Sequence, residues 1–333
     1  MTSSRISRII ATGSYLPERV MLNADLEAMV ETTDAWIQER TGIKQRHIIA
    51  DDQVTSDLAV AAAKQAIARA GLTPNDIDLV LVATTTPDKI FPSTATIVQR
   101  ELGITNSCPA FDLQAVCTGF VYALSVADQF IKTGMVKRTL VIGAESLSRI
   151  TNWSDRSNCI LWGDGAGAVI LEAVAQQDGQ PVKSGIIATH IHADGQYEQL
   201  LHVPSGPSRV AQTDDVAERT MTMKGNEVFK VAVNTLSRIA TETLAKNQID
   251  ASELDWLVPH QANLRIIKAT GKKLGLDDSQ VVVTVDQHGN TSSASIPLAL
   301  DQAITDGRIR RGQLMLLEAF GGGFTWGSAL IRY

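Results

Sequence analysis

An internal repeat constrains the fold of this 333-residue chain more than any other feature. Residues 128 to 138 read DQFIKTGMVKR and residues 301 to 311 read DQAITDGRIRR, so the two segments align without a gap at an offset of 173. A second pair, DIDLVLVATT at 76 to 85 and ELDWLVPHQA at 253 to 262, matches in pattern at an offset of 177. Two matches in the same order predict a chain built from two copies of one structural unit.

Apolar runs alternate with helical patterns along both copies. A helix is expected over SDLAVAAAKQAIARAGL, with Ser56 as its N-cap and Gly71 just past its end. Nearly continuous apolar runs are typical of strands covered by helices on both faces. The chain is therefore expected to be an α/β protein whose halves, 1–174 and 175–333, pack into one body. The expected strands are LVLVAT (79–84), TLVIGA (139–144), GAVILEA (167–173), WLVPH (256–260) and LMLLEA (314–319), with CPAFDLQAV (108–116) and VVVTV (281–285) preceding two of the helices.

Composition and cysteine usage exclude several classes of protein. The net charge of −6 argues against a general nucleic-acid-binding protein. No apolar run approaches the roughly 18 residues of a membrane-spanning helix, and the N-terminal MTSSRISRIIATGSYLPERV lacks the apolar core of a secretion signal. Three cysteines without a CxxC disfavour both a disulfide framework and a zinc site. A cytoplasmic protein without metal is expected.

The segment GDGAGAVILE at 163 to 172 has the glycines of a dinucleotide-binding loop. In such loops the glycines open a helix, whose N-terminus holds the pyrophosphate. Here they lead into an apolar strand, so the sequence predicts no NAD site.

The repeat relates Cys117 to a position in the other half. An offset of 173 places Cys117 opposite Asn290, and both residues stand between an apolar strand and the start of a helix. If a pseudo-twofold axis passes between these helix starts, the two side chains meet. His260 ends the strand WLVPH, where active-site residues of α/β folds commonly lie. Cys117, His260 and Asn290 are therefore expected to converge.

Their chemistry is coherent as an acyl-transfer site. A helix N-terminus lowers a thiol pKa and favours the nucleophilic thiolate. Neutral imidazole and carboxamide groups both donate hydrogen bonds to an oxyanion, and FGGGFTWG at 320 to 327 offers accessible backbone amides. The alternatives are structural: an inert buried cysteine, as expected for Cys108 and Cys159, a histidine satisfied at a strand end, and an asparagine that caps a helix.

Five motifs of the chain belong together: DLQAVCTGF, VPHQANLRI, GNTSSASIP, LWGDGAGAVIL and EAFGGGFTWGSAL. In this order they resemble one enzyme family, the β-ketoacyl-acyl carrier protein synthases III, and the similarity extends over essentially the whole chain. The resemblance implies a thiolase-like five-layered α-β-α-β-α sandwich of two similar halves. It implies decarboxylative condensation of a short acyl-CoA, with acetyl-CoA as the expected donor, and malonyl-acyl carrier protein, without metal or redox cofactor. The alternative is a related condensing enzyme or acyltransferase of secondary metabolism that uses an unusual acyl group.

The resemblance also assigns roles to residues. Cys117 matches the nucleophile that accepts the acyl group, and His260 and Asn290 match the pair that binds the malonyl thioester carbonyl. The backbone amides of Cys117 and Gly322 correspond to the oxyanion hole. Thr118 and Ser293 depart modestly from the family pattern, since smaller residues are common at both positions.

A helix over TTDAWIQERTG places Trp36 and Arg40 on one face, at i and i+4. An indole can stack on adenine and a guanidinium can bind phosphate. By itself this pattern favours a partly buried tryptophan beside a solvated arginine. The resemblance matches Trp36, Arg40 and Arg156 to coenzyme A contacts.

A basic face follows His260. Arg265, Lys268 and Lys272 share one helical face, with Lys273 adjacent. Such a face is usually only solvated, but acyl carrier proteins are strongly acidic, and the family resemblance implicates Arg265 and Lys230 in carrier docking. The resemblance further implies a homodimer in which Phe91, in DKIFPSTATIVQ, closes the acyl pocket of the partner subunit.

Overall fold

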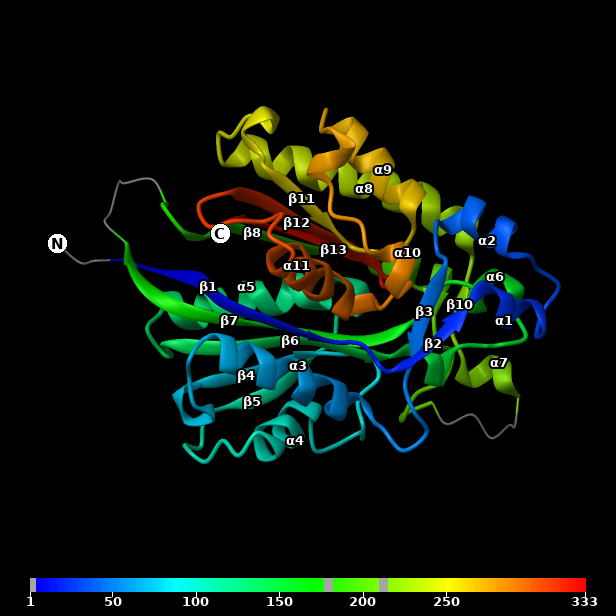
Figure 1. Ribbon diagram of the computed structural model, residues 1–333, viewed down its shortest axis with the longest axis horizontal. Helices are drawn as coiled ribbons and strands as arrows, with labels where there is room; N and C mark the ends of the chain where they lie inside the picture. The colour runs from blue at the N-terminus through cyan, green and yellow to red at the C-terminus, as the bar shows by residue number, and fades with distance from the viewer. Residues whose placement is uncertain (1–3, 177–181, 210–214) are drawn as a thin grey trace.

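Two large sheets and three helical layers make up most of the described chain, beside two small two-stranded sheets, β2-β3 and β9-β10. The computed structural model describes residues 4–176, 182–209 and 215–333. In Figure 1 the layers run from α3 and α4, through the first sheet, to α5 and α11 at the centre, and then through the second sheet to α8 and α9. This is the expected five-layered α-β-α-β-α arrangement.

The first sheet has the strand order β1-β7-β6-β4-β5. Its outer face is covered by α3 and α4, and apolar side chains of β4, β6 and β7 alternate between this outer layer and the central one. The elements are β1 (Ser4–Tyr15), β4 (Leu79–Ala83), β5 (Ala110–Leu113), β6 (Arg138–Ser146), β7 (Asp164–Gln176), α3 (Thr55–Arg69), α4 (Thr94–Glu101) and α5 (Gly119–Lys132).

The second sheet has the order β11-β12-β13-β8. Helices α8 and α9 cover its outer face (Figure 1), and side chains of α5 and α11 share the core cluster of the central layer. The expected strand VVVTV contributes only a parallel bridge between Val281 and Leu257. The elements are β8 (Gly185–Ala193), β11 (Trp256–Pro259), β12 (Leu314–Gly321), β13 (Thr325–Arg332), α8 (Gly225–Lys246), α9 (Leu264–Lys273) and α11 (Ser295–Thr305).

The remaining elements connect the layers or cover their ends. They are β2 (Arg19–Leu22), α1 (Asn23–Glu27), α2 (Asp34–Thr41), β3 (Gln45–Ile48), α6 (Arg156–Cys159), β9 (Leu201–His202), α7 (Val216–Arg219), β10 (Thr222–Met223), α10 (Val285–His288) and the 3₁₀ turns η1 (Pro74–Asp76), η2 (Val116–Thr118), η3 (Leu147–Ile150), η4 (Gly195–Leu200), η5 (Ala251–Glu253), η6 (Asp278–Gln280) and η7 (Ser292–Ala294).

Strand register confirms the internal repeat. Leu81 of β4 pairs with Val141 of β6 in the first sheet, and Val258 of β11 pairs with Leu317 of β12 in the second. All four side chains belong to the core cluster of the central layer. The halves therefore correspond strand by strand, with offsets of 177 for β4 and β11 and of 176 for β6 and β12. The predicted division after residue 174 remains a prediction.

The offset of 173 holds only at the ends of the central helices. Helix α5 has 14 residues and α11 has 11, so the three-residue difference arises at their beginnings. Strand β6 then begins at Arg138 and β12 at Leu314, which restores the offset of 176. A gap-free alignment is therefore wrong at the helix starts, although it correctly reveals the repeat.

Local sequence accounts for the helix limits. Gly71 follows α3 in the left-handed region, as expected, but α3 begins at Thr55 and its N-cap is Val54, whose N–H is bound by Asp57. Ser56 is therefore inside the helix. Expected strands 139–144, 167–173 and 314–319 lie inside the longer β6, β7 and β12, and expected strands 79–84 and 256–260 run one residue past β4 and β11.

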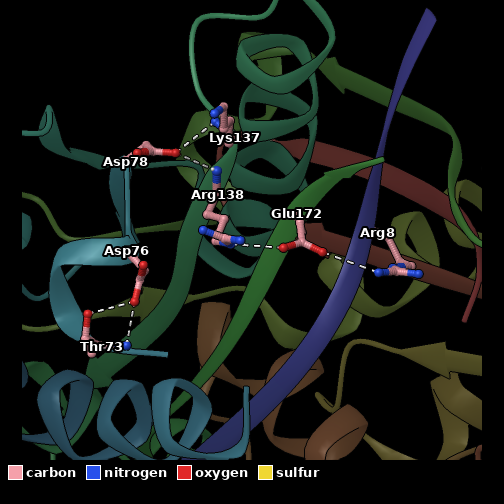
Figure 2. A network of polar contacts seen from close by, with 7 residues as sticks. All are labelled: Arg8, Thr73, Asp76, Asp78, Lys137, Arg138 and Glu172. Carbon is pink, nitrogen blue, oxygen red and sulfur yellow. Dashed lines mark hydrogen bonds and ion pairs between the residues drawn. The ribbon is translucent and has the colours of Figure 1, made fainter. Parts of the chain in front are cut away.

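A polar network fixes the register at one end of the first sheet (Figure 2). Glu172 of β7 lies opposite both Arg138 of β6 and Arg8 of β1, and it pairs with them at 2.9 Å and 3.3 Å. Asp78 accepts the backbone N–H groups of Lys137 and Arg138, both at 2.9 Å. A shift of one residue would break these pairs and turn every apolar side chain to the wrong face.

Candidate active site

Cys117 lies in the 3₁₀ turn η2, directly before α5. The residue before it, Val116, has a left-handed φ of 49°, so the chain turns sharply from β5 into the helix. The Cys117 side chain is buried, with 3% of its surface exposed. A Cβ on Gly321 would lie 2.8 Å from Cys117 N, so only glycine fits there.

Ser293, and not Asn290, occupies the position in the second half that corresponds to Cys117. Ser292 has the same left-handed φ of 49° as Val116, and each begins a 3₁₀ turn that leads into a central helix. The turns η2 and η7 pack against one another, as expected for helix starts at a pseudo-twofold axis. The prediction of Asn290 as the symmetry mate was wrong because α11 begins three residues late.

Burial dominates the electrostatics of Cys117. It raises the pKa of the Cys117 thiol to about 12, an effect that the charge of Glu145 increases. The helix N-terminus was expected to lower this pKa, and that expectation is wrong because burial raises it. The thiol is neutral at pH 7, so acyl transfer requires a group that accepts its proton.

His260 follows β11 and is buried, with its backbone N–H bound to Glu318 O at 2.8 Å. Ser295 Oγ accepts Gln261 N–H at 3.3 Å and lies 2.6 Å from His260 Nδ1. When Ser295 gives its one hydrogen to Nδ1, the proton of the neutral ring is on Nε2. Burial lowers the pKa of His260 to about 3, so the ring stays neutral and acts as a hydrogen-bond donor.

Asn290 is fixed by both its backbone and its side chain. Its N–H binds Leu161 O at 2.8 Å, and its carbonyl accepts Gly163 N–H at 3.0 Å. Its side-chain Oδ1 accepts Ser292 N–H at 2.9 Å. The acceptor atom is thereby occupied, and the Nδ2 hydrogens remain available to a bound molecule.

Two cavities meet at Cys117. The first is lined by Cys117, His260 and Asn290 together with apolar side chains of α8 and α9, which brings the three predicted residues to one place. The second, larger cavity is lined by Cys117 and Gly322, and extends past Leu147 and Ile150 to Ile90. Cys117 therefore lines both cavities. The first also holds the polar side chains of His260 and Asn290, and the second is largely apolar.

Trp36, Arg40 and Arg156 form a surface cluster. Helix α2 is capped by Thr33 and followed by left-handed Gly42, as the sequence indicated. The guanidinium of Arg40 lies 5.5 Å from the Trp36 ring centroid, and that of Arg156 lies at 4.9 Å.

The cluster adjoins the first cavity. Asn263, which lines that cavity, donates its Nδ2 hydrogen to Arg40 O at 2.9 Å. Helix α2 therefore contacts a residue in the wall of the first cavity.

The basic face predicted on α9 is exposed. Arg265, Lys268, Lys272 and Lys273 all reach solvent, as does Lys230 on the neighbouring α8. The Arg265 guanidinium lies 5.1 Å from the ring centroid of Phe229, a residue of the first cavity. Lys268 pairs with Asp278 at 3.4 Å, so its charge is partly neutralised.

Phe91 lies on the segment between β4 and α4 and is 83% exposed. Its neighbour Ile90 is 77% exposed and lines the second cavity. Thr118, noted as a departure from the family pattern, donates to Thr325 O at 3.1 Å.

Three residues of the site were missed from the sequence. Ser295 lies 2.6 Å from His260 Nδ1, Ser292 lines the second cavity with Cys117, and Glu145 accepts a hydrogen bond from Ser293. The run of serines in GNTSSASIP was a signal for Ser292 and Ser295, because both lie within five residues of Asn290. Glu145 gave no local signal, since its contacts come from residues distant in the chain.

Within the described ranges, no group of three or more His, Cys, Asp or Glu side chains is arranged to hold a metal ion. Across the same residues, no helix combines the length and apolar character needed to cross a bilayer.

Comparisons with known proteins agree with this geometry. Residues 111–195 match the model of 3-oxoacyl-[acyl-carrier-protein] synthase III, and residues 244–333 match the model of its C-terminal part. The chain is 63% identical to the β-ketoacyl-[acyl-carrier-protein] synthase III of Thiobacillus denitrificans, over 98% of this chain and 99% of that one. This chain belongs to the β-ketoacyl-acyl carrier protein synthase III family.

Other members of the family show the same extent of similarity. The synthase III of Thioalkalivibrio sulfidiphilus is 61% identical, over 98% of this chain and 99% of its own. The crystal structure of 3-oxoacyl-[acyl-carrier-protein] synthase III from Aquifex aeolicus is 46% identical and superposes with a TM-score of 0.89, covering 98% of this synthase III and all of that one. This chain therefore has the thiolase-like fold and is a condensing acyltransferase.

Proposed function

We propose that this synthase III condenses a short acyl-CoA with malonyl-acyl carrier protein and so initiates fatty acid synthesis. The products are β-ketoacyl-acyl carrier protein, CoA and CO2. The observation that carries the proposal is the first cavity, where the thiol of Cys117 shares one enclosed space with the donor groups of His260 and Asn290.

Cys117 is the proposed nucleophile. Its sulfur attacks the thioester carbonyl of acyl-CoA, CoA leaves as thiolate, and an acyl-cysteine remains. The backbone amides of Cys117 and Gly322 are proposed to bind the oxyanion. Both residues line the second cavity, which is largely apolar and is the proposed site for the acyl chain.

His260 and Asn290 are proposed to act on the malonyl group. Loss of CO2 leaves an enolate whose negative oxygen needs hydrogen-bond donors. Neutral His260 and the free Nδ2 of Asn290 can both donate, and neither needs to be deprotonated first. The enolate carbon then attacks the acyl-cysteine and releases the Cys117 thiolate.

Trp36, Arg40 and Arg156 are the proposed coenzyme A site. The partly exposed indole offers a stacking surface, and the two guanidinium groups beside it offer charge for phosphates. Replacing Trp36 by Ala should raise the KM for acyl-CoA and leave that for malonyl-acyl carrier protein unchanged.

Lys230, Arg265, Lys268, Lys272 and Lys273 form the proposed docking surface for acyl carrier protein. Their exposure next to the first cavity supports this proposal, since an acidic partner would be guided there by charge. Among these five residues, Arg265 contacts Phe229, which lines the first cavity.

Two copies of this chain are proposed to pair through the segment that holds Phe91. Strong exposure of Phe91 and Ile90 beside the second cavity supports pairing that would complete the acyl pocket. Phe91→Asp should shift the mass measured by light scattering from dimer towards monomer. The proposed setting is the cytoplasm, in keeping with the three free cysteines.

The direct test is product formation. Purified protein given acetyl-CoA and malonyl-acyl carrier protein should release CO2 and form acetoacetyl-acyl carrier protein. If longer, branched or aromatic acyl-CoAs react and acetyl-CoA does not, the donor assignment is wrong. If no acyl-CoA reacts, the condensing activity itself is contradicted.

A further inference from the structure

Asn290 is held in place by a segment that belongs to the other half of the molecule. Its N–H binds Leu161 O at 2.8 Å, and Gly163 N–H binds Asn290 O at 3.0 Å. The two stretches of backbone form a parallel bridge between Trp162 and Asn290. The direction of the Asn290 side chain therefore depends on where residues 160–163 lie.

Arg46 of β3 binds the start of that segment. The Arg46 side chain is fully buried, and its Nη2 donates to Ile160 O at 2.8 Å. Its Nη1 donates to Asn23 Oδ1 at 2.8 Å and, at the longer distance of 3.4 Å, to Met21 O. One guanidinium group therefore joins residues 160–163 to β2 and to the start of α1.

The aliphatic stem of Arg46 packs against both sides of the bridge that holds Asn290. A Cβ added to Gly163 would lie 3.1 Å from Arg46 Cβ, and a Cβ added to Gly289 would lie 3.0 Å from it. Gly289 directly precedes Asn290 and has a left-handed φ of 67°. Arg46 is thus packed against the residue before Asn290 and against the residue that binds the Asn290 carbonyl oxygen.

The charge of Arg46 is bound by neutral oxygen atoms. Across residues 4–176, 182–209 and 215–333, its hydrogen bonds go to two carbonyl oxygens and one carboxamide oxygen, and to no carboxylate. Burial lowers the pKa of Arg46 to about 10, from an ordinary value of 12.5, so the group remains charged at pH 7. Charged donors make stronger hydrogen bonds than neutral ones. The flat guanidinium also holds two oxygens of different segments at once, which the single ammonium group of lysine does not match.

We propose that Arg46 is a positioning residue for Asn290, which fixes residues 160–163 and so aims the Asn290 Nδ2 hydrogens at the malonyl thioester oxygen. This rests on the proposed role of Asn290 in decarboxylation. Arg46 lines neither of the two cavities at Cys117, so it acts on the reaction through the backbone that it binds. Its loss should slow the step that uses Asn290 and leave substrate binding unchanged.

The contacts of Arg46 also reach the proposed coenzyme A site. Asn23 Nδ2 donates to Asp34 Oδ1 at 2.8 Å, and Asp34 begins α2, the helix that carries Trp36. Effects on coenzyme A binding are separated from effects on Asn290 when acylation of Cys117 is measured at saturating acetyl-CoA.

Arg46→Lys keeps the charge and an aliphatic stem but removes the planar fork. Release of CO2 from malonyl-acyl carrier protein should slow about 30-fold, because a small displacement of a catalytic group is costly, and the KM for that substrate should not change. Acylation of Cys117 at saturating acetyl-CoA, followed by intact mass, should stay near the wild-type rate. Arg311→Lys is the matched control. Arg311 also donates to two backbone carbonyls, those of Ile9 and Ile10, and its replacement should leave CO2 release unchanged.

Combination with Asn290→Ala separates positioning of this side chain from general damage to the fold. If Arg46 acts through the Asn290 side chain, Arg46→Lys should cause no further loss once that side chain is gone. The double variant should then release CO2 at the rate of Asn290→Ala alone. A purely structural role would lower the rate by the same factor in both backgrounds and would slow acylation as well.

Arg46→Met keeps the inference testable whether or not Arg46→Lys folds well. It places no charge in the interior, and replacement of buried charges by apolar groups of similar volume is often tolerated. It should show the same selective loss of CO2 release. Wild-type CO2 release in either variant, or equal losses in both backgrounds, would overturn the role of Arg46 and leave that of Asn290 intact. Wild-type CO2 release in Asn290→Ala would instead contradict the proposed function of Asn290.

Discussion

Cys117 and Ser293 occupy equivalent positions in the two halves of the molecule, each one residue after a backbone φ of 49° and at the start of a central helix. Their surroundings differ in one respect. Glu145 of β6 binds Ser293, whereas the corresponding residue of β12 is Gly321, which packs against Cys117. Cys117 therefore has the glycine backbone of β12 packed against it, and Ser293 has a carboxyl of β6.

Gly321→Ala should disable Cys117 without unfolding the protein. Its Cβ would lie 2.8 Å from Cys117 N and 3.0 Å from Cys117 Cβ, so the turn must shift. Because small displacements of a reacting group are costly, acylation should fall about 100-fold. Gly195→Ala is the matched control, since a Cβ there meets nothing within 4 Å. Mass spectrometry of both variants after exposure to acetyl-CoA measures the acylation of Cys117. Equal acylation in the two variants would show that the close approach of Gly321 to Cys117 is unimportant.

The sequence predicted the elements well because their signals are local. Continuous apolar runs identify the strands, and Thr33 and Gly42 mark the limits of α2. The repeat was also recognisable, since its best-preserved part lies where the central helices end. The residue-by-residue correspondence of the two halves was not recognisable, because α11 is three residues shorter than α5 at its start and no sequence pattern marks this difference.

The site was predictable as a set of residues but not as an environment. Cys117, His260 and Asn290 could be placed at strand and helix ends, which meet in one cavity. The pKa of Cys117 was misjudged because burial depends on packing between two layers. The contact of Ser293 with Glu145 joins residues 148 positions apart, and only the folded chain shows it.

His260→Ala and Asn290→Ala should separate the two halves of the reaction. Loss of either donor should slow malonyl decarboxylation about 100-fold or more, because a buried oxyanion then lacks a hydrogen bond. Acylation of Cys117 should be affected less. Release of CO2 from malonyl-acyl carrier protein and the mass of the acyl-enzyme measure the two steps independently. Equal losses in both would contradict the assigned role.

Two buried histidines should contribute stability that is lost as the pH is lowered towards 4. Burial lowers the pKa of His260 to about 3 and that of His288 to about 4, from an ordinary value of 6.5. Between those values each histidine binds a proton in the unfolded chain but not in the folded one, so its contribution to the free energy of unfolding rises with pH and is lost as pH falls below about 6.5. Buried carboxyls such as Glu145 and Asp164, whose pKa values burial raises, act in the opposite direction. Urea unfolding at pH 4 to 7 measures the net slope.

Replacing one of these histidines should make that net slope less positive. His288→Gln removes one group that takes up a proton on unfolding, which is worth at most about 1.4 kcal/mol per pH unit. Replacing His47 instead gives the comparison, since its ring centroid lies 6.4 Å from that of His288. An unchanged slope in His288→Gln would mean that His288 is not held neutral in the folded protein.

Arg265→Glu should weaken use of the carrier substrate alone. Reversing a charge on the docking surface should raise the KM for malonyl-acyl carrier protein about tenfold, and added salt should reduce the difference. Transfer from acyl-CoA to Cys117 should be unchanged. Lys64→Glu makes the same change of charge on α3, in the opposite outer layer, and should have no effect. If both variants behave alike, net charge and not docking at Arg265 is responsible.

The most direct measurement is the intact mass of the protein after exposure to a panel of acyl-CoAs, with Cys117→Ala beside the wild type. The account predicts that acetyl-CoA adds one acetyl group to the wild-type protein and none to the variant. Acylation that persists in Cys117→Ala, together with full turnover, would contradict Cys117 as the nucleophile and with it the central claim.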